Sequence, residues 1–493
     1  MNGETLLTLN EGKTLEFKRD LSSPKGLLKT LVAFANTAGG KLIIGVEDKT
    51  RQVIGVDFPL DDEERLCSLI ADSISPRLVP NVEMTTVDNR TLLIVEVFPS
   101  NSRPHFLRSE GPENGVYVRL GSTNRQADRE LIGELRRSAE GVSFDEMPLP
   151  ELSADDLDIK AARRAFAGKR ELDEQELITL KLLRSEQGRL APTKGAMILF
   201  GRERIFHFPD AWVQCGRFIG HDKTDIFDHI ELDEPLPQAV ESIMLFLKKH
   251  AMRGADFSEI QRKDVWSIPL SVLREVVINA LVHTDYSQRG APIRIAFFDD
   301  RIEVENPGIL LPGMTIEDMK SGVSKIRNPV IARVFRELKL IEQWGSGVRN
   351  ILHQSREMGL PEPLVQEIGM RLRFTIFLAE PQVLDKQQSG SRSGRAARSE
   401  SGAQSGAQSG SESGAQSETV LLALSGAPLS AAELMHLLGL ETKTGAFKRM
   451  IKELQQQALI EYIFPDKPTS RLQKYRLTEN GKAHLTSMGD SHA

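Results

Sequence analysis

The feature that most constrains the fold is a stretch near the C-terminus that cannot contribute to a core. Residues 387–418 contain no aromatic and no large aliphatic residue, and the tetrapeptide Ser-Gly-Ala-Gln recurs there three times. Such a segment buries too little apolar surface to offset the entropy lost on ordering. We therefore predict a disordered linker over 381–418, with a root-mean-square span of roughly 30 Å, so that the chain folds as separate parts on either side of it.

The rest of the chain has the composition of a multidomain soluble protein. Its 493 residues are too many for one core, and 40% hydrophobic and 27% charged residues are ordinary values. A net charge of −6 means that nucleic-acid binding would depend on local basic patches. Two distant cysteines and no run of 18 apolar residues argue against a disulfide framework and a membrane span. We expect a cytoplasmic protein of multidomain α+β class.

Residues 419–484, beyond the linker, regain globular character. An apolar helix is expected from 419, and Ser430 with Glu433 forms the pattern of a capping box before a second helix. A third helix and two strands complete the order, at 443–457, 459–464 and 474–477. Three helices followed by a hairpin predict a winged helix, a module that contacts DNA or another protein.

A polar stripe marks the helix predicted at 274–286. Glu275, Asn279 and His283 recur at i, i+4 and i+8, which places them on one helix face. An amide oxygen can ligate Mg²⁺, and a carboxylate one turn away can orient water toward a γ-phosphate. The alternative is a surface helix with a solvated polar side.

Two glycine-containing turns follow this helix. A predicted hairpin, 293–298 with 302–305, runs into Asn306-Pro307-Gly308, and Gly345-Ser346-Gly347 opens another helix. A polar strand end beside a glycine turn can hold a purine amino group, and a Gly-x-Gly turn presents backbone N–H groups to phosphates. The ordered trio predicts a nucleotide site.

These motifs resemble the GHKL ATPase superfamily, which includes gyrase, Hsp90 and histidine kinases. The chain is more similar to a divergent branch often labelled helicase-like, through NALVHTDYS, DDRIEVENPG, RNPVIARVF and IEQWGSGVRNI. The resemblance implies an α/β sandwich that, with a connector, spans 143–380, binds Mg²⁺-ATP and commonly forms homo-oligomers. It assigns water orientation or general-base catalysis to Glu275, Mg²⁺ ligation to Asn279, and adenine contact to Asn306. It also makes Gly308, Gly345 and Gly347 glycine-box residues.

The first glycine box departs from the superfamily pattern. Asp-x-Gly-x-Gly is replaced by Asn306-Pro307-Gly308-Ile309-Leu310. An amide accepts from adenine less strongly than a carboxylate, and the second glycine is missing. ATP binding is therefore expected, whereas hydrolysis is left open. The sequence also has no Walker-type phosphate loop, so it gives the helicase label no support.

Residues 1–142 form a further α+β unit with a mixed sheet. A helix over 30–37 precedes a Gly-Gly turn and a strand at 41–46, and further strands are expected at 91–98 and 115–120. The text from Glu11 to Lys18, Phe34-Ala35-Asn36 and Tyr117-Val118-Arg119 closely resembles the Schlafen AlbA-like domain. That resemblance implies binding to DNA or RNA.

In nuclease-active relatives of this domain, acidic residues form a metal-bound triad. The matching positions are Glu11, Glu16 and Asp48, with Glu47 instead of Asp48 if the register differs. Three converging carboxylates could hold Mg²⁺ or Mn²⁺ for phosphodiester cleavage. The alternative is solvated surface charge on a domain that only binds.

Nearby cations form a candidate phosphate-contacting set, with ordinary surface charge as the alternative. They are Lys18, Arg103, Arg119 and Arg125, together with His105 and Arg108. The first interpretation of the whole chain is an ATP-binding, nucleic-acid-binding transcriptional regulator. The second is a metal-dependent nuclease gated by ATP, with anti-phage defence as one role, and the third is a scaffold with a degenerate ATPase fold.

Overall fold

The computed structural model describes the ranges 7–48, 50–256, 263–341, 347–379, 419–425, 428–438, 451, 454–455, 457–463, 474–482 and 485. The chain divides into two compact units, 1–384 and 385–493. The predicted linker lies outside the described residues, as do Gly345 and most of the helix predicted at 443–457. No helix in the described ranges is long and apolar enough to cross a bilayer.

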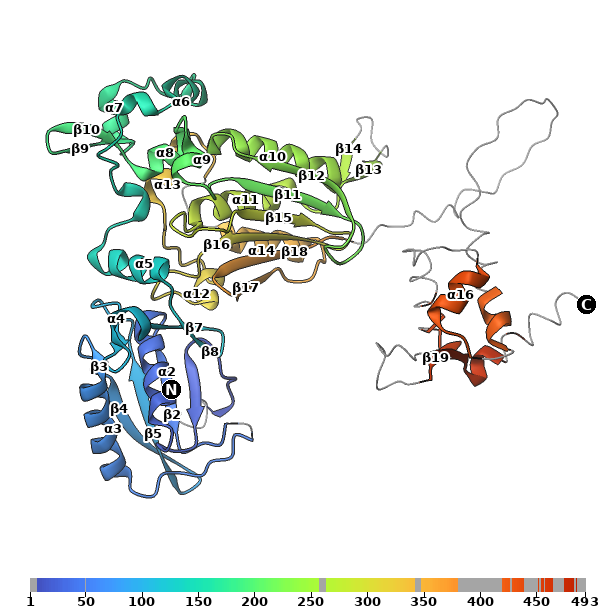
Figure 1. Cartoon of the computed structure of the whole chain (residues 1–493), viewed down its shortest axis with the longest axis horizontal. Helices are drawn as coiled ribbons and strands as arrows, with labels where there is room; N and C mark the ends of the chain where they lie inside the picture. Colours follow the sequence, from blue (N-terminus) through green and yellow to red (C-terminus); the bar gives the residue numbers. More distant parts are fainter. Residues whose placement is uncertain are drawn as a thin grey trace, which may run out of the picture. The chain divides into compact units, whose positions relative to one another are not determined.

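The N-terminal domain is built on a four-stranded mixed sheet in the order β1-β2-β5-β4 (Figure 1). Parallel pairing joins β1 to β2, and antiparallel pairing joins β2 to β5 and β5 to β4. Helices α2 and α3 bury their apolar sides against one sheet face, in a core that includes Leu31, Leu42 and Val95. The mixed α+β arrangement is as predicted. Its elements are β1 (Leu15–Lys18), α2 (Pro24–Asn36), β2 (Gly40–Ile44), α3 (Pro59–Ser73), β4 (Asn81–Val87) and β5 (Arg90–Val97).

Shorter elements close this domain, and one buried amide holds them together. Asn36 donates from Nδ2 to the carbonyls of His105 and Tyr117, at 2.9 and 3.0 Å, and accepts from His105 N at 2.8 Å. Asp128 caps the last helix of the domain by accepting from Leu131 N. These elements are β3 (Ile74–Ser75), β6 (Phe106–Leu107), α4 (Gly111–Asn114), β7 (Tyr117–Leu120), β8 (Thr123–Gln126) and α5 (Arg129–Glu140).

A connector of short elements leads into the second domain. Asp145, fully buried in the 3₁₀ turn η1, accepts from the backbone N–H groups of Val330 and Ile331 at 2.7 and 3.1 Å. It thereby caps a helix almost two hundred residues downstream. The connector comprises η1 (Phe144–Glu146), η2 (Ala154–Asp156), α6 (Ile159–Phe166), α7 (Glu174–Thr179), β9 (Leu183–Glu186), β10 (Arg189–Pro192), α8 (Lys194–Phe200) and α9 (Arg204–His207).

A six-stranded sheet, ordered β12-β11-β15-β16-β18-β17, organises the second domain. Only β11 and β15 pair in parallel. One face packs against α10, α11 and α13 in the largest core of the described residues, which includes Cys215, Ile295 and Val304. The predicted hairpin is confirmed as β15 with β16. The elements are β11 (Val213–Phe218), β12 (Ile226–Leu232), α10 (Leu236–Ala251), β13 (Met252–Asp256), β14 (Lys263–Trp266), α11 (Leu270–His283), β15 (Ile293–Phe297), β16 (Arg301–Pro307), α12 (Ile316–Lys320), α13 (Pro329–Glu337), α14 (Gly347–Glu357), β17 (Leu364–Ile368) and β18 (Arg371–Phe377).

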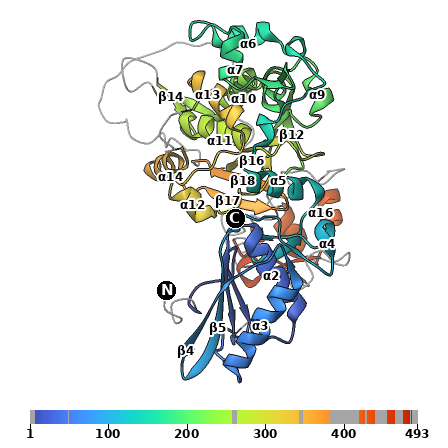
Figure 2. The same cartoon turned by 90° about the vertical axis from the view of Figure 1, so that its left-hand side faces the viewer.

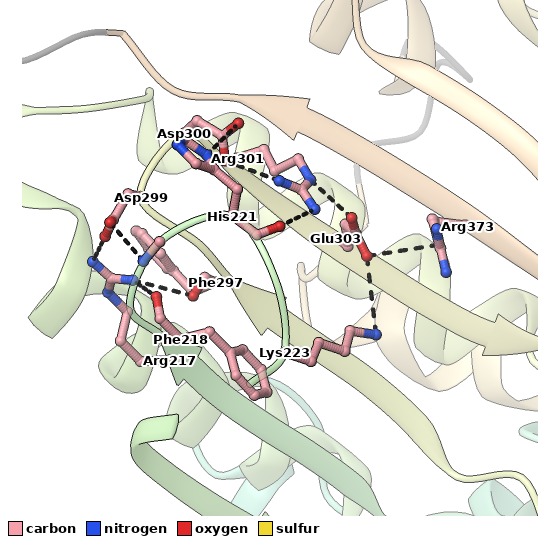
Figure 3. A network of polar contacts seen from close by, with 11 residues as sticks. Arg217, Phe218, His221, Lys223, Phe297, Asp299, Asp300, Arg301, Glu303 and Arg373 are labelled. Carbon is pink, nitrogen blue, oxygen red and sulfur yellow. Dashed lines mark hydrogen bonds and ion pairs between the residues drawn. The ribbon is translucent and has the colours of Figure 1, made fainter. Parts of the chain in front are cut away.

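The other face of this sheet carries charged side chains (Figure 3). Glu303 and Glu305 alternate on β16 and are buried beneath longer cationic side chains. Arg301 bonds Glu303 at 2.8 Å, and Arg373 bonds Glu305 at 2.6 Å. Lys223, from the β11–β12 loop, reaches the same pair. Cross-strand ion pairs therefore replace an apolar layer on this side.

The C-terminal unit has a small core of its own, which includes Leu421, Leu434 and Ile460. The predicted capping box is present, since Glu433 N donates to Ser430 Oγ and Ser430 N donates to Glu433 Oε2. Its described elements are a helix over 419–425, α16 (Ala431–Leu437), β19 (Ile460–Tyr462) and β20 (Tyr475–Leu477). The two strands form the predicted antiparallel pair. The complete winged helix stays a prediction.

Candidate functional site

The polar stripe of α11 opens into a cavity of about 370 Å³ in the second domain. The two turns predicted to complete a nucleotide site line the same cavity: Glu275 and Asn279 come from α11, Asn306 and Gly308 from the end of β16, and Gly347 from the start of α14. His283, the third residue of the stripe, lines it as well. Five predicted nucleotide-site residues, far apart in sequence, thus share one cavity.

Glu275 and Asn279 contact each other directly. Asn279 Nδ2 donates to Glu275 Oε1 at 3.1 Å, so Oδ1 of the amide is the atom that can ligate a cation. The carboxylate also reaches the start of α14, because a Cβ atom built on Gly347 would lie 1.8 Å from Glu275 Oε1. A glycine is therefore required where these two helices meet.

Asn306 occupies the position expected to contact a purine. The residue is 5% exposed, and its Nδ2 donates to the carbonyl of Pro307 at 3.2 Å. The carbonyl oxygen of the amide remains as a possible acceptor for an amino group. Gly308 follows with φ of +102°, and a Cβ there would meet the Arg327 guanidinium at 2.9 Å. Only glycine adopts that backbone without strain in such close quarters.

Among the described residues that line the cavity, cations outnumber anions. Arg274, Lys325, Arg327 and Arg336 line it, whereas Glu275 is the acidic residue of its lining. Arg327 is paired with Glu134, while Lys325 Nζ donates to the carbonyl of Pro312 at 2.9 Å and has no acidic partner among the described residues. The remaining positive charge suits a polyphosphate. Sequence reasoning did not single out Lys325 or Arg336, although the quoted RNPVIARVF contains Arg327 and lies between them.

His283 is neutral near pH 7. Burial and the Arg327 guanidinium lower the pKa of His283 to about 4. The imidazole therefore offers the cavity a hydrogen-bonding group rather than a further positive charge.

The N-terminal carboxylates lie near one another, but cations already engage the central one. Glu16, at 8% exposure, pairs with Lys18 at 2.5 Å and with Arg119. Glu11 Oε1 accepts from Phe17 N at 2.8 Å. Burial and the neighbouring Glu16 and Asp48 carboxylates raise the pKa of Glu11. Within the described ranges no three His, Cys, Asp or Glu side chains are arranged to hold a metal ion, so a triad geometry is not preformed.

The expected phosphate contact at Arg119 needs correction. This side chain is 1% exposed, and besides pairing with Glu16 it donates to Gly12 O at 3.1 Å and Asn124 Oδ1 at 3.0 Å. It ties β7 to the β1 region and is not accessible to a phosphate. His105 is likewise buried, with Nδ1 against Pro76 O at 2.8 Å.

The other candidate cations differ in accessibility. Arg103 is half-buried and bonds Ser100 O and Ser138 Oγ, and burial lowers the pKa of Arg103. Lys18 is engaged by Glu16, and Glu47, the substitute acidic position, pairs with Arg19 at 2.6 Å. Arg125 on β8 and Arg108 are exposed. The accessible part of the set is therefore Arg108 and Arg125.

Comparison with known protein families gives three matches. Residues 11–128 match "Schlafen, AlbA_2". Residues 290–376 match HATPase_c_4, described as "Putative ATP-dependent DNA helicase recG C-terminal". Residues 415–478 match "Filamentation induced by cAMP protein Fic-like, C-terminal domain", a relationship that the sequence reasoning did not anticipate. The second match includes Asn306, Gly308 and Gly347, whereas α11 lies before it.

Two solved structures are also similar. The DIP2311 protein from Corynebacterium diphtheriae is 18% identical, with 96% of this chain and 98% of that chain covered and a TM-score of 0.40. The N-terminal domain of a RecG-related protein from Nitrosomonas europaea is 26% identical over 26% of this chain and 94% of its own, with a TM-score of 0.22.

No curated protein matches the chain. The family matches nevertheless agree with the two resemblances seen in the sequence. The chain therefore contains a Schlafen AlbA_2 domain and an HATPase_c_4 domain of the kind found in RecG-related proteins.

Proposed function

We propose that this chain is an ATP-binding, nucleic-acid-binding regulator whose second domain binds Mg²⁺-ATP. The observation that carries the proposal is the single cavity that collects Glu275, Asn279, Asn306, Gly308 and Gly347. Its volume of about 370 Å³ lies in the range of ligand pockets. Regulation of transcription, a cytoplasmic location and assembly into homo-oligomers belong to the same proposal.

The cavity residues fit the chemistry of a nucleotide. Asn306 would accept from the adenine amino group, and the cations Lys325 and Arg336 would compensate phosphate charge. Asn279 Oδ1 would ligate Mg²⁺, which when bound neutralises phosphate oxygens. Glu275 stands one helical turn away, where it could orient water, so a slow hydrolysis is compatible with the site.

Calorimetric titration with the non-hydrolysable analogue AMP-PNP and Mg²⁺ tests the proposal. Asn279→Ala should weaken binding at least about tenfold, since a charge-assisted contact is worth about 1.5–3 kcal/mol. Asn81→Ala is the matched control, because Asn81 is an exposed asparagine of the N-terminal domain whose side-chain amide donates to Glu83. If the wild type does not bind AMP-PNP, the proposal is wrong.

Nucleic-acid binding is proposed for the AlbA_2 domain, with the C-terminal unit as a winged helix that adds a DNA contact. Arg108 and Arg125 are the accessible cations. Arg125→Glu should weaken the binding of a DNA or RNA oligonucleotide in fluorescence anisotropy and reduce its salt dependence. Arg136→Glu, an exposed change on α5 in the same domain, should have a smaller effect.

Metal-dependent cleavage is the competing function. We propose binding rather than cleavage because the Glu16 carboxylate, which would have to bind the metal ion, already forms ion pairs with Arg119 and Lys18. Glu11→Gln and Asp48→Asn are the variants to use in a cleavage assay, because changing Glu16 would also leave the buried Arg119 without its ion-pair partner. The nuclease proposal would replace the regulator proposal if the wild type cleaved an oligonucleotide in the presence of Mg²⁺ or Mn²⁺ and both variants lost cleavage but kept binding.

A further inference from the structure

One wall of the nucleotide cavity rests on the N-terminal domain, and we use the name AlbA_2 domain for this whole domain, the match at 11–128 together with α5. We call residues 308–327 the wall segment; they run from the end of β16 through α12 and contribute more lining residues than any other segment. Figure 2 shows α12 and α5 between the six-stranded sheet and the N-terminal sheet. Contacts on the side of the wall segment that faces away from the cavity therefore affect the position of the cavity wall.

The first anchor is a buried ion pair. Arg327, at the end of the wall segment, pairs with Glu134 on α5 and also donates to the Ile309 carbonyl. Ile309 itself packs with Val118, Leu131 and Leu135, in a core cluster otherwise built largely from β7 and α5. Both ends of the wall segment are thus fixed to α5.

Two further anchors come from other parts of the AlbA_2 domain. Lys13 Nζ bonds the Glu367 carboxylate at 2.6 Å, and the same carboxylate accepts from the backbone N–H of Leu310 at 2.8 Å. Gly313 N donates to the carbonyl of Thr37, which follows α2, at 2.8 Å. These contacts join the first part of the wall segment to Thr37 directly and to Lys13 through Glu367 of β17.

The Lys13 anchor continues into the acidic and basic cluster of the AlbA_2 domain. Its neighbour Gly12 accepts from Arg119, which pairs with Glu16. Two sets of polar contacts, Leu310–Glu367–Lys13 and Gly12–Arg119–Glu16, are therefore joined by the peptide bond between Gly12 and Lys13. Packed and hydrogen-bonded elements of this kind are physical carriers of coupling, provided that one of them changes position.

We propose that nucleotide occupancy of the cavity and the conformation of the AlbA_2 domain are coupled through the wall segment, with Glu134–Arg327 and Lys13–Glu367 as its anchors. The inference rests on the proposed nucleotide binding and adds regulation of that site. A nucleotide that contacts Lys325 shifts the wall segment and with it the anchors. By linkage, a ligand on the AlbA_2 domain changes nucleotide affinity by the same factor.

Hydrogen exchange of the full chain, with and without Mg²⁺-AMP-PNP, tests the coupling. In the wild type we expect slower exchange in cavity peptides over 275–283 and 347–357, and changed exchange over 10–18 and 129–137. Glu134→Gln and Lys13→Met should keep the cavity response and reduce the distant one at least about threefold in magnitude, in line with typical coupling factors above 5. Glu113→Gln, in the exposed pair with Arg136 of α5, should leave both responses intact.

The outcomes separate the coupling from nucleotide binding. Protection confined to the cavity in the wild type would overturn the coupling while nucleotide binding stands. An unchanged distant response in both anchor variants, with their folding verified by circular dichroism, would also overturn it. No exchange change anywhere would remove the nucleotide proposal and this inference with it.

Discussion

Gly347 and Glu275 lie so close that a Cβ atom on residue 347 would be 1.8 Å from the Glu275 carboxylate oxygen Oε1. The start of α14 therefore meets the functional stripe of α11 only because residue 347 has no side chain. A glycine at a helix start also leaves backbone N–H groups accessible to a phosphate. The same residue serves both the packing of two helices and the proposed ligand contact.

Gly347→Ala should consequently lower nucleotide affinity. The methyl group forces Glu275 or the first turn of α14 to move, and we expect Mg²⁺-AMP-PNP to bind about tenfold more weakly, or about 1.4 kcal/mol. The measurement is calorimetric titration. Gly26→Ala is the control, since its Cβ would make an ordinary 3.6 Å contact with Ser23 Oγ. Equal affinities in wild type and Gly347→Ala would refute the steric argument.

Arg119→Met should destabilise the AlbA_2 domain rather than weaken phosphate contact alone. Removing the guanidinium leaves Glu16 buried with Lys18 as its remaining cation, and losing one partner of a buried pair costs about 3–5 kcal/mol. Urea denaturation followed by circular dichroism measures the loss. Arg125→Met, at an exposed position, should change stability by less than about 0.5 kcal/mol. If the two variants were equally stable, the structural role of Arg119 would be wrong.

Local periodicity made much of the cavity predictable. Glu275, Asn279 and His283 recur with helical spacing, and α11 does place all three in the lining. The β15–β16 hairpin ending at Asn306 was likewise readable, because alternation and the turn Asp299-Asp300 are local signals. The fold class and the two domain types follow from such signals together with the family motifs.

Contacts between distant segments were not predictable in the same way. Arg119 was predicted as a phosphate-contacting cation, but it is buried with Glu16, 103 residues away. Arg327 and Glu134 are separated by 193 residues. Nothing in either local sequence indicates the partner, so a buried ion pair is indistinguishable from surface charge until the fold brings its ends together. Lys325 and Arg336 escaped notice because only the fold shows that they line the cavity.

The low pKa of His283 has two consequences for pH dependence. Its folded pKa of about 4 lies below the ordinary value of 6.5, so between these values the unfolded chain binds more protons than the folded one. Stability is therefore lost as the pH falls from 6.5 toward 4. Between pH 6 and 8 the imidazole stays neutral in the fold, and it should add no pH dependence to nucleotide affinity.

The comparison of His283→Gln with wild type checks this. Denaturation midpoints of the variant should fall less steeply below pH 6.5. His353→Gln serves as control, since His353 is an exposed residue of α14 paired with Glu357. A steeper acid sensitivity in His283→Gln than in wild type would show that the sign is wrong.

The buried carboxyl group of Asp145 makes stability depend on pH in the opposite direction from His283. Burial raises the pKa of Asp145 to about 7, from its ordinary value of 3.8, because the low-polarity surroundings of η1 oppose ionisation more than the two N–H groups of α13 favour it. The folded state therefore keeps a proton between pH 4 and 7 that the unfolded chain has released, and the contribution of Asp145 to stability falls as pH rises through that window.

Asp145→Asn keeps an acceptor for Val330 N but does not titrate. Its free energy of unfolding relative to wild type should rise between pH 4.5 and 7.5, whereas Asp173→Asn, at the exposed cap of α7, tests capping without burial. A relative stability of Asp145→Asn that stayed constant across this range would mean that Asp145 is ionised throughout and acts as an ordinary helix cap.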